Sequence, residues 1–393
     1  MIARIVIPLL LVIVLSDLYI DVHYFRRRYS VARWMRLLWW VPCIGMTAYT
    51  IALASLKSFA PSDPAWLNTY LLLLGLFVGP KAIFALCSLI GSCCLRLMRH
   101  PRFNGGHYAG IVLAIGGMLT YVYGLTTGFS QIKVTHITLH FDTLPPAFDG
   151  YKIVQISDLH LGSFYGWRQK ILKAEMDSIH KQHADLIVFT GDLQNIRPSE
   201  ILPHAQWVAH ATRGTVSVLG NHDDSGYADD PSGRQSATMR QQLAGIESNL
   251  LGWHPLLNDH IILRRGGDSI VVAGMENEGE PPFPNHADLR RTMRGVSSKS
   301  FVVMLQHDPT AWQRTILPQT QAQLTLSGHT HGGQMQLFGW RPTQWKGTPD
   351  KGLYTQRGRC LYVNAGLGGL VPFRLNMPAE ITVITLKSKQ TAK

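Results

Sequence analysis

Four long apolar runs occupy the first third of the chain, and they restrict that region to helices that cross a membrane. The runs lie at about residues 2–20, 37–56, 66–95 and 108–129, and each approaches or exceeds the ~20 residues that span a bilayer. The third run is interrupted by Gly79-Pro80-Lys81, so it forms either one kinked span or a re-entrant pair, and we favour one span. We therefore predict an α-helical membrane anchor of about four transmembrane helices over residues 1–130.

Basic residues between the runs predict how these helices are oriented. Residues 1–130 hold eleven Lys and Arg against three Asp and Glu. The second connecting segment offers only Lys57, whereas the first and third carry Arg26, Arg27, Arg28, Arg33, Arg36, Arg96, Arg99 and Arg102. The positive-inside rule then places everything after residue 129 outside the cytoplasm, on the periplasmic side of a bacterial inner membrane. If the third run instead formed two crossings separated at Gly79-Pro80, everything after residue 129 would lie on the opposite, cytoplasmic side.

After residue 130 the sequence changes to short strands, which predicts a soluble α/β domain. Apolar and polar residues alternate over 132–140, so we assign 131–150 as a connecting strand and linker and 151–393 as one domain. Helices are expected at about 167–183 and 200–211. Residues 224–284 are rich in Gly, Pro and Asp, and we expect loops there around a short strand near 269–273. The buried strands are predicted at 153–156, 186–189, 216–219, 301–305 and 322–326.

A polar cluster follows each of these five buried strands. Open α/β sheets bind their ligands at the carboxyl ends of strands, so we expect the polar side chains to meet. His329 and His331 are two residues apart and flanked by glycines, so their imidazoles point to one face and two adjacent metal ions could share their loop. The candidate site residues are Asp158, His160, Asp192, Asn221, His222, Asp223, His307, His329 and His331.

Each candidate also has an ordinary structural role when it is considered alone. Asp158 or Asp192 could cap the helix that follows it, and Asn221 could be a turn residue. Their joint occurrence favours a metal site. Four of the five cysteines lie in the apolar region, so neither a disulfide framework nor a cysteine-rich zinc site is expected. The sequence shows no basic patch interleaved with aromatic residues, so no nucleic acid is expected as a partner.

The sequence resembles the calcineurin-like metallophosphoesterase superfamily in five motifs, which occur in that family's order. The motifs are Asp158-Leu159-His160, Gly191-Asp192, Gly220-Asn221-His222-Asp223, His307 and Gly328-His329-Thr330-His331. Residues 144–162, the extension Gly332-Gly333-Gln334 and the ending Pro378-Ala379-Glu380-Ile381 resemble its YkuE-like branch, some members of which carry N-terminal membrane spans. The resemblance covers about residues 150–387 and implies a four-layer α/β/β/α sandwich.

The same resemblance implies two divalent metal ions. It assigns the first ion to Asp158, His160, Asp192 and His331, and the second to Asp192, Asn221, His307 and His329, so that Asp192 bridges them. Mixed nitrogen and oxygen donors suit Mn, Fe, Zn or Co, and two such ions clamp a phosphate and activate a water. His222 would orient the phosphate or protonate the leaving oxygen, with Asp223 holding its tautomer.

These observations together predict a membrane-anchored, dinuclear metal-dependent phosphohydrolase that cleaves a phosphomonoester, phosphodiester or pyrophosphate bond. A domain tethered by membrane spans reaches lipid-borne phosphates most easily, so we favour a lipid-linked or nucleotide-linked substrate and expect the lipid bilayer as a partner. Two alternatives remain: a non-catalytic membrane sensor or scaffold that binds a phosphate ligand, and a nuclease of the same superfamily. Arg168 and Arg374 could contact substrate phosphate, although arginines near loops are more often solvated.

Overall fold

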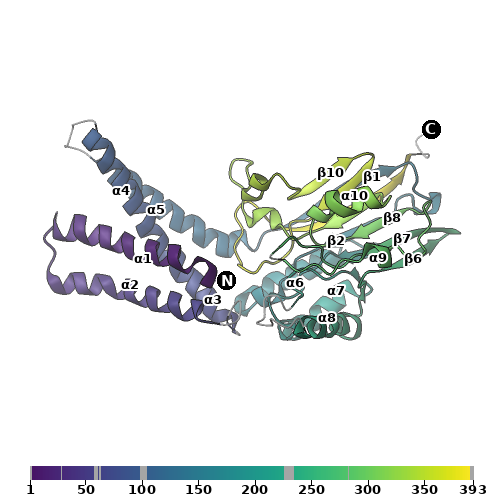
Figure 1. Ribbon diagram of the computed structural model, residues 1–393, viewed down its shortest axis with the longest axis horizontal. Coiled ribbons are helices and arrows are strands. Elements are labelled where there is room, and N and C mark those ends of the chain that lie inside the picture. Colours follow the sequence, from purple (N-terminus) through teal and green to yellow (C-terminus); the bar gives the residue numbers. More distant parts are fainter. Residues whose placement is uncertain are drawn as a thin grey trace. The chain divides into compact units, whose positions relative to one another are not determined.

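The chain forms two compact units, Met1–Thr126 and Thr127–Lys393, which Figure 1 shows in a computed structural model. The structure describes residues 2–27, 29–56, 61, 63–97, 104–224, 234–281 and 283–389. Four of the loop cations that predicted the orientation, Arg28, Lys57, Arg99 and Arg102, lie outside the described residues.

The first unit is helical, as its apolar runs predict. In the described part of the chain, four helical runs are long and apolar enough to cross a membrane: Val6–Arg26, Arg33–Ala54, Ala65–Leu97 and Gly105–Gly128. They contain the α-helices α1 (Val6–Ile20), α2 (Arg33–Ala54), α3 (Pro64–Leu73), α4 (Gly79–Leu97) and α5 (Gly105–Tyr123). The prediction of about four transmembrane helices is confirmed.

The interrupted third run is one continuous helix rather than a re-entrant pair. A π-helical turn, Leu74–Val78, joins α3 to α4 directly before Gly79 and Pro80. Proline has no N–H to donate, so a helix that contains it loses a backbone hydrogen bond, and a wider turn accommodates the misfit without ending the helix.

Charged side chains inside the helical unit are paired with one another. Lys81 Nζ lies 2.9 Å from both carboxylate oxygens of Asp17. The Arg36 guanidinium donates two hydrogen bonds, of 2.6 and 2.8 Å, to Asp21, and α1 continues past Asp21 as a π-helical turn to Arg26. Both aspartates are buried. Pairing neutralises charges that would be costly in an apolar surrounding.

The second unit contains two six-stranded sheets. One sheet has the order β1-β12-β2-β3-β4-β5, and the other has the order β10-β11-β9-β8-β7-β6. The first comprises β1 (Ile132–Phe141), β2 (Lys152–Ile156), β3 (Leu186–Phe189), β4 (Val216–Ser217), β5 (His254–Pro255) and β12 (Ala379–Ser388). The second comprises β6 (Asp259–Arg265), β7 (Asp268–Gly274), β8 (Val302–Leu305), β9 (Leu324–Ser327), β10 (Gly352–Gln356) and β11 (Arg359–Val363).

Alternating strand residues build three apolar layers, and these layers make the unit a four-layer sandwich. Ile153, Val188 and Val303 belong to the cluster between the two sheets, whereas Val154 and Met304 belong to the outer clusters. The cluster outside the first sheet includes residues of α6 (Gln169–His180), α7 (Ala205–Thr212) and α8 (Arg234–Ile246), and the cluster outside the second includes residues of α9 (Leu289–Thr292) and α10 (Leu317–Gln319). The predicted α/β/β/α architecture is confirmed.

The stretch predicted as loops, 224–284, contains more regular structure than its sequence suggested. It includes α8 and the antiparallel pair β6 and β7. Only a narrow face of α8, around Met239, Leu243 and Ile246, joins the core, so its apolar signal is weak. β6 is an edge strand with polar residues at both ends. The strand predicted near 132–140 is β1, and it pairs in parallel with β12.

Glu247, in the turn Glu247–Leu251 after α8, links the stability of the second unit to pH. Ser217 Oγ donates a 2.6 Å hydrogen bond to it, but burial dominates and raises its pKa from 4.5 to about 8. Between those values the folded protein keeps a proton that the unfolded chain releases, so the free energy of unfolding falls as pH rises.

We expect the melting temperature of Glu247→Gln in detergent to fall less than that of the wild type between pH 4.5 and pH 8. Identical profiles, or the same change in the exposed control Asp177→Asn, would contradict this.

Candidate metal centre

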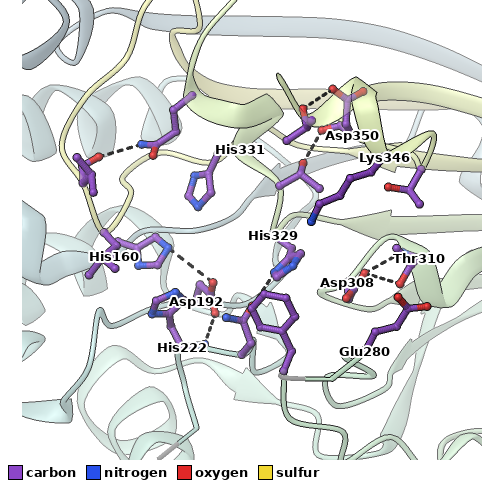
Figure 2. A pocket seen from close by; sticks show the side chains of 18 of the residues that line it. His160, Asp192, His222, Glu280, Asp308, Thr310, His329, His331, Lys346 and Asp350 are labelled. Carbon is purple, nitrogen blue, oxygen red and sulfur yellow. Dashed lines mark hydrogen bonds and ion pairs between the residues drawn. The ribbon is translucent and has the colours of Figure 1, made fainter. Parts of the chain in front are cut away.

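The seven predicted ligands meet at the carboxyl ends of five strands that come from both sheets. β2, β3 and β4 of the first sheet lead to Asp158, His160, Asp192 and Asn221, and β8 and β9 of the second lead to His307, His329 and His331. A cavity of about 570 Å³ opens beside them. Figure 2 shows His160, Asp192, His329 and His331 around this cavity. Five of the seven line this cavity, while Asp158 and His307 are fully buried beside it.

Asp158, His160 and His331 form the first group of donors. One donor atom from each residue lies within 4.8 Å of the others. His331 Nε2 is 3.2 Å from Asp158 Oδ1, and the rings of His160 and His331 are stacked with centroids 5.2 Å apart. The three side chains can therefore face one common point.

Asp192, His307 and His329 form the second group, whose donor atoms also lie within 4.8 Å of one another. His307 Nε2 is 3.1 Å from Asp192 Oδ2 and 3.1 Å from Asn221 Oδ1. Asn221 Oδ1 is also 2.6 Å from His329 Nδ1. His160 Nε2 lies 3.6 Å from Asp192 Oδ2, so the Asp192 carboxylate connects the two groups.

The electrostatics of the cluster fit divalent cations. Burial lowers the pKa of His160 to about 3 and that of His329 to about 4, so these imidazoles are neutral and keep a lone pair for a metal. Burial also disfavours charge on His307, but the carboxylates of Asp192 and Asp158 outweigh it and raise its pKa to about 10. The buried carboxylates thus attract positive charge, and His160 and His329 offer neutral nitrogen donors beside them. A bound divalent cation would take the place of the proton on His307, so the set suits divalent metal ions.

Backbone strain is concentrated at these donors. Asp158, His160, Asp192, His329 and His331 all have positive φ, between 45° and 73°, a region that costs a non-glycine residue about 1–3 kcal/mol. Neighbouring glycines allow the loops to approach closely. A Cβ on Gly220 would lie 2.2 Å from Asp192 Oδ1, and one on Gly328 would lie 2.3 Å from Asp158 Oδ2. The glycines of the motifs are therefore required by packing around the carboxylates.

His222 lies at the cavity wall, but Asp223 does not make the predicted contact with its ring. His222 Nδ1 is 2.8 Å from the carbonyl oxygen of Asn195, which can only accept, so this nitrogen carries the proton. The buried Asp223 carboxylate instead accepts backbone hydrogen bonds from Asp192, Leu193, Gln194 and Gly220. Asp223 thus stabilises the loop that carries Asp192, and a role in setting the tautomer of His222 belongs to Asn195.

Several residues of the site are not among those predicted from the sequence. Asn195 also places its side-chain oxygen 3.1 Å from His160 Nδ1, so it orients two imidazoles at once. Lys346 reaches into the cavity in Figure 2, where Asp308 and Thr310 form part of the facing wall. Asp308 directly follows His307 in the sequence and could have been noticed, but neither Asn195 nor Lys346 belongs to a motif.

Arg374 does not have the role of a phosphate contact that its position near a loop allowed. Its side chain is fully buried, and it donates hydrogen bonds to the backbone carbonyls of residues 365–368, 377 and 378. The glycine-rich loop that it holds donates in turn through Leu367 N and Gly368 N to the carbonyls of Ser157 and Asp158. Arg374 therefore stabilises the loop that hydrogen-bonds to the backbone of the predicted ligand Asp158, and its buried side chain is not placed to contact a substrate.

Comparisons with known proteins agree with this architecture. A family model described as "Calcineurin-like phosphoesterase" matches residues 151–333, and one described as "Probable Calcineurin-like phosphoesterase, transmembrane domain" matches residues 3–129. The chain is 33% identical to the uncharacterized metallophosphoesterase YkuE of Bacillus subtilis (strain 168), over 72% of this chain and 94% of YkuE.

Two further relatives have informative names. The chain is 28% identical to a transmembrane protein with metallophosphoesterase domain of Danio rerio, over 68% of this chain and 60% of that protein. It is 25% identical to the UDP-2,3-diacylglucosamine pyrophosphatase LpxG of Chlamydia trachomatis serovar D, over 68% of this chain and 93% of LpxG. The chain belongs to the calcineurin-like phosphoesterase family, and it is a metal-dependent phosphoesterase joined to a membrane-helix region.

Proposed function

We propose that this membrane protein is a dinuclear phosphohydrolase whose two divalent ions are held by the two donor groups described above. The observation that carries this proposal is the position of the Asp192 carboxylate, 3.1 Å from His307 of one group and 3.6 Å from His160 of the other. Asn221 would complete the second group through its side-chain oxygen. When bound, such ions would polarise the P–O bonds of the substrate and make a water nucleophilic at neutral pH.

The surrounding residues would bind and orient the phosphate. The His222 ring lines the cavity and donates through Nδ1 to the Asn195 carbonyl, so a second proton, taken up at Nε2, would let it orient the phosphate or protonate the leaving oxygen. Burial lowers the pKa of His222, so its imidazolium form gives up a proton readily, and the negative charge of a bound phosphate would favour formation of that imidazolium. Lys346 would supply a positive charge to the substrate phosphate at the opposite wall.

A lipid-linked phosphate or pyrophosphate is the proposed substrate class. Four membrane-spanning helices belong to the same chain as the catalytic unit, which keeps that unit close to a lipid surface. The cavity combines Lys346 with the apolar side chains of Phe283, Leu370 and Val371, so it can accept both a phosphate and part of an apolar group. The name of the relative LpxG designates a diacylated nucleotide sugar with a pyrophosphate bond, which supports the same class.

Substitution of the connecting carboxylate or of a histidine tests the dinuclear site. We expect Asp192→Asn and His329→Ala to reduce turnover of bis(4-nitrophenyl) phosphate by more than about 100-fold, since even outer contacts of metal sites contribute roughly 10- to 100-fold. The measurement uses the purified, manganese-loaded protein, with metal content determined alongside. The exposed His180→Ala serves as the matched histidine control. Unchanged turnover in both site variants, or activity that survives complete removal of metal by a chelator, would contradict the proposal.

Lys346 provides a separate test of phosphate binding. We expect Lys346→Ala to raise KM about tenfold with little change in kcat, because a charge-assisted hydrogen bond contributes roughly 1.5 kcal/mol and a tenfold change in affinity corresponds to ~1.4 kcal/mol. Lys346→Arg should keep KM near the wild-type value, and the exposed Lys299→Ala should leave both constants unchanged. Equal effects on KM from Lys346→Ala and Lys299→Ala would exclude a specific contact.

The predicted orientation places the catalytic unit on the periplasmic side of a bacterial inner membrane, and the arginines of the first and third connecting segments support it. We expect protease added to spheroplasts to cleave the second unit. Protection in spheroplasts together with cleavage in inverted membrane vesicles would place the unit in the cytoplasm instead.

A further inference from the structure

Large apolar side chains stand in solvent on one segment of the second unit, residues 337–347, which we name the aromatic rim. Phe338 is 108% exposed and Trp345 is 88% exposed, relative to an extended reference, and Leu337 and Trp340 are also exposed. Trp345 lies in a short 3₁₀ helix, Pro342–Lys346. Contiguous exposed apolar surface commonly marks a site of interaction with a protein or a membrane.

The aromatic rim is an ordered structure that holds these side chains outward. Leu337 and Trp340 exchange two backbone hydrogen bonds of 2.9 Å, and Phe338 and Gly339 between them have φ of 50° and 86°. Two positive φ values in a two-residue turn are typical of a tight hairpin. Phe338 therefore occupies the tip of a turn, in a backbone conformation that is unfavourable for a bulky residue.

One buried carboxylate anchors the aromatic rim to the catalytic cavity. The Arg341 guanidinium donates hydrogen bonds of 2.7 and 2.9 Å to Asp350, and Thr343 Oγ1 donates another of 2.8 Å. Thr330, which lies between His329 and His331, donates to the backbone carbonyl of Asp350 at 2.5 Å. Thr343 and Lys346 of the rim also line the cavity. The rim is thus one wall of the cavity and an exposed apolar surface at the same time.

Charge and chemistry indicate what covers this surface. Residues 335–360 contain five basic residues and one acidic residue, Asp350. Arg341 is paired with Asp350, which leaves the positive charges of Lys346, Lys351, Arg357 and Arg359. Tryptophan and phenylalanine next to basic residues are typical of the interface between lipid headgroups and acyl chains, where the basic side chains attract anionic lipids. Phe338 and Trp345 are almost fully exposed, so the described residues of the chain do not pack around them, which fits insertion into a deformable lipid layer.

We propose that the aromatic rim docks on the interfacial layer of an anionic lipid bilayer and brings the mouth of the catalytic cavity to phosphates carried by lipids. The use of the cavity on such phosphates rests on the proposed function, but the contact between rim and bilayer does not. The membrane helices of the same chain keep the second unit near a bilayer, so the rim needs only weak affinity to remain docked.

Tryptophan fluorescence of the full chain in vesicles tests this contact. The protein is reconstituted in brominated phosphatidylcholine with phosphatidylglycerol, and the emission of Trp345 is obtained as the difference between the wild type and Trp345→Phe. We expect bromine to quench most of that emission, and the quenching to weaken when phosphatidylglycerol is omitted or salt is raised. Trp312, which is 2% exposed in the core, gives the matched control through Trp312→Phe, and its emission should be unaffected.

Two results would contradict the docking of the rim on lipid. Emission of Trp345 that acrylamide quenches and bromine does not would overturn the proposal, since the rim would then face water. Emission protected from both quenchers would also overturn it, because a protein surface or a second copy would cover the rim. Trp340→Phe repeats the comparison at a second rim position. Turnover of bis(4-nitrophenyl) phosphate with manganese, measured in the same vesicles, reports on the proposed function independently of quenching.

Discussion

The buried carboxylate of Asp192 is the group around which the second unit is arranged. Burial favours its protonated form, but the charges of His307 and His222 outweigh burial and hold its pKa well below the ordinary value. An ionised carboxylate at this depth is stable only if opposite charges or donors surround it. His160 approaches from the first sheet and His307 from the second, and the backbone N–H of His222 donates at 2.7 Å. The carboxyl ends of both sheets therefore have to meet here.

Meeting at one point strains the connecting loops, and buried polar side chains compensate for that strain. The loops after β2, β3 and β9 carry donors with positive φ, and none of these conformations is favoured for a residue with a Cβ. Asp223 accepts four backbone hydrogen bonds around Asp192, Asn195 orients His160 and His222, and Arg374 holds the glycine loop that supports Asp158. The geometry of the donors is thus built by residues that do not themselves face the cavity.

The division between donors and supporting residues explains what could be predicted from the sequence. A buried strand followed by a polar cluster is a local pattern, so Asp158, Asp192 and the histidines after β8 and β9 could be found, and the family resemblance supplied the layers of the fold. Asn195 acts through contacts with residues that lie far from it in the sequence, His160 and His222, for which no local pattern exists. Arg374 donates its hydrogen bonds to nearby backbone carbonyls, but an arginine beside a glycine-rich loop does not indicate by itself that its side chain is buried. Asp223 stands next to His222 in the sequence, yet its side chain points to backbone groups instead. The prediction that Asp223 contacts the ring of His222 rested on their adjacency in the sequence, and it was wrong.

Both units depart from the usual arrangement of apolar side chains inside and charged side chains outside, but in opposite ways. In the helical unit, charged groups are buried and neutralise one another, as Lys81 does with Asp17. Replacing such a pair with apolar residues is often neutral or stabilising, so stability alone does not explain the pair. In the second unit, apolar groups that could have been buried are instead held in solvent at Phe338 and Trp345 by a hairpin and an arginine–carboxylate pair. An ordered structure that exposes apolar side chains beside the proposed catalytic cavity is best explained by a lipid surface that removes those side chains from water.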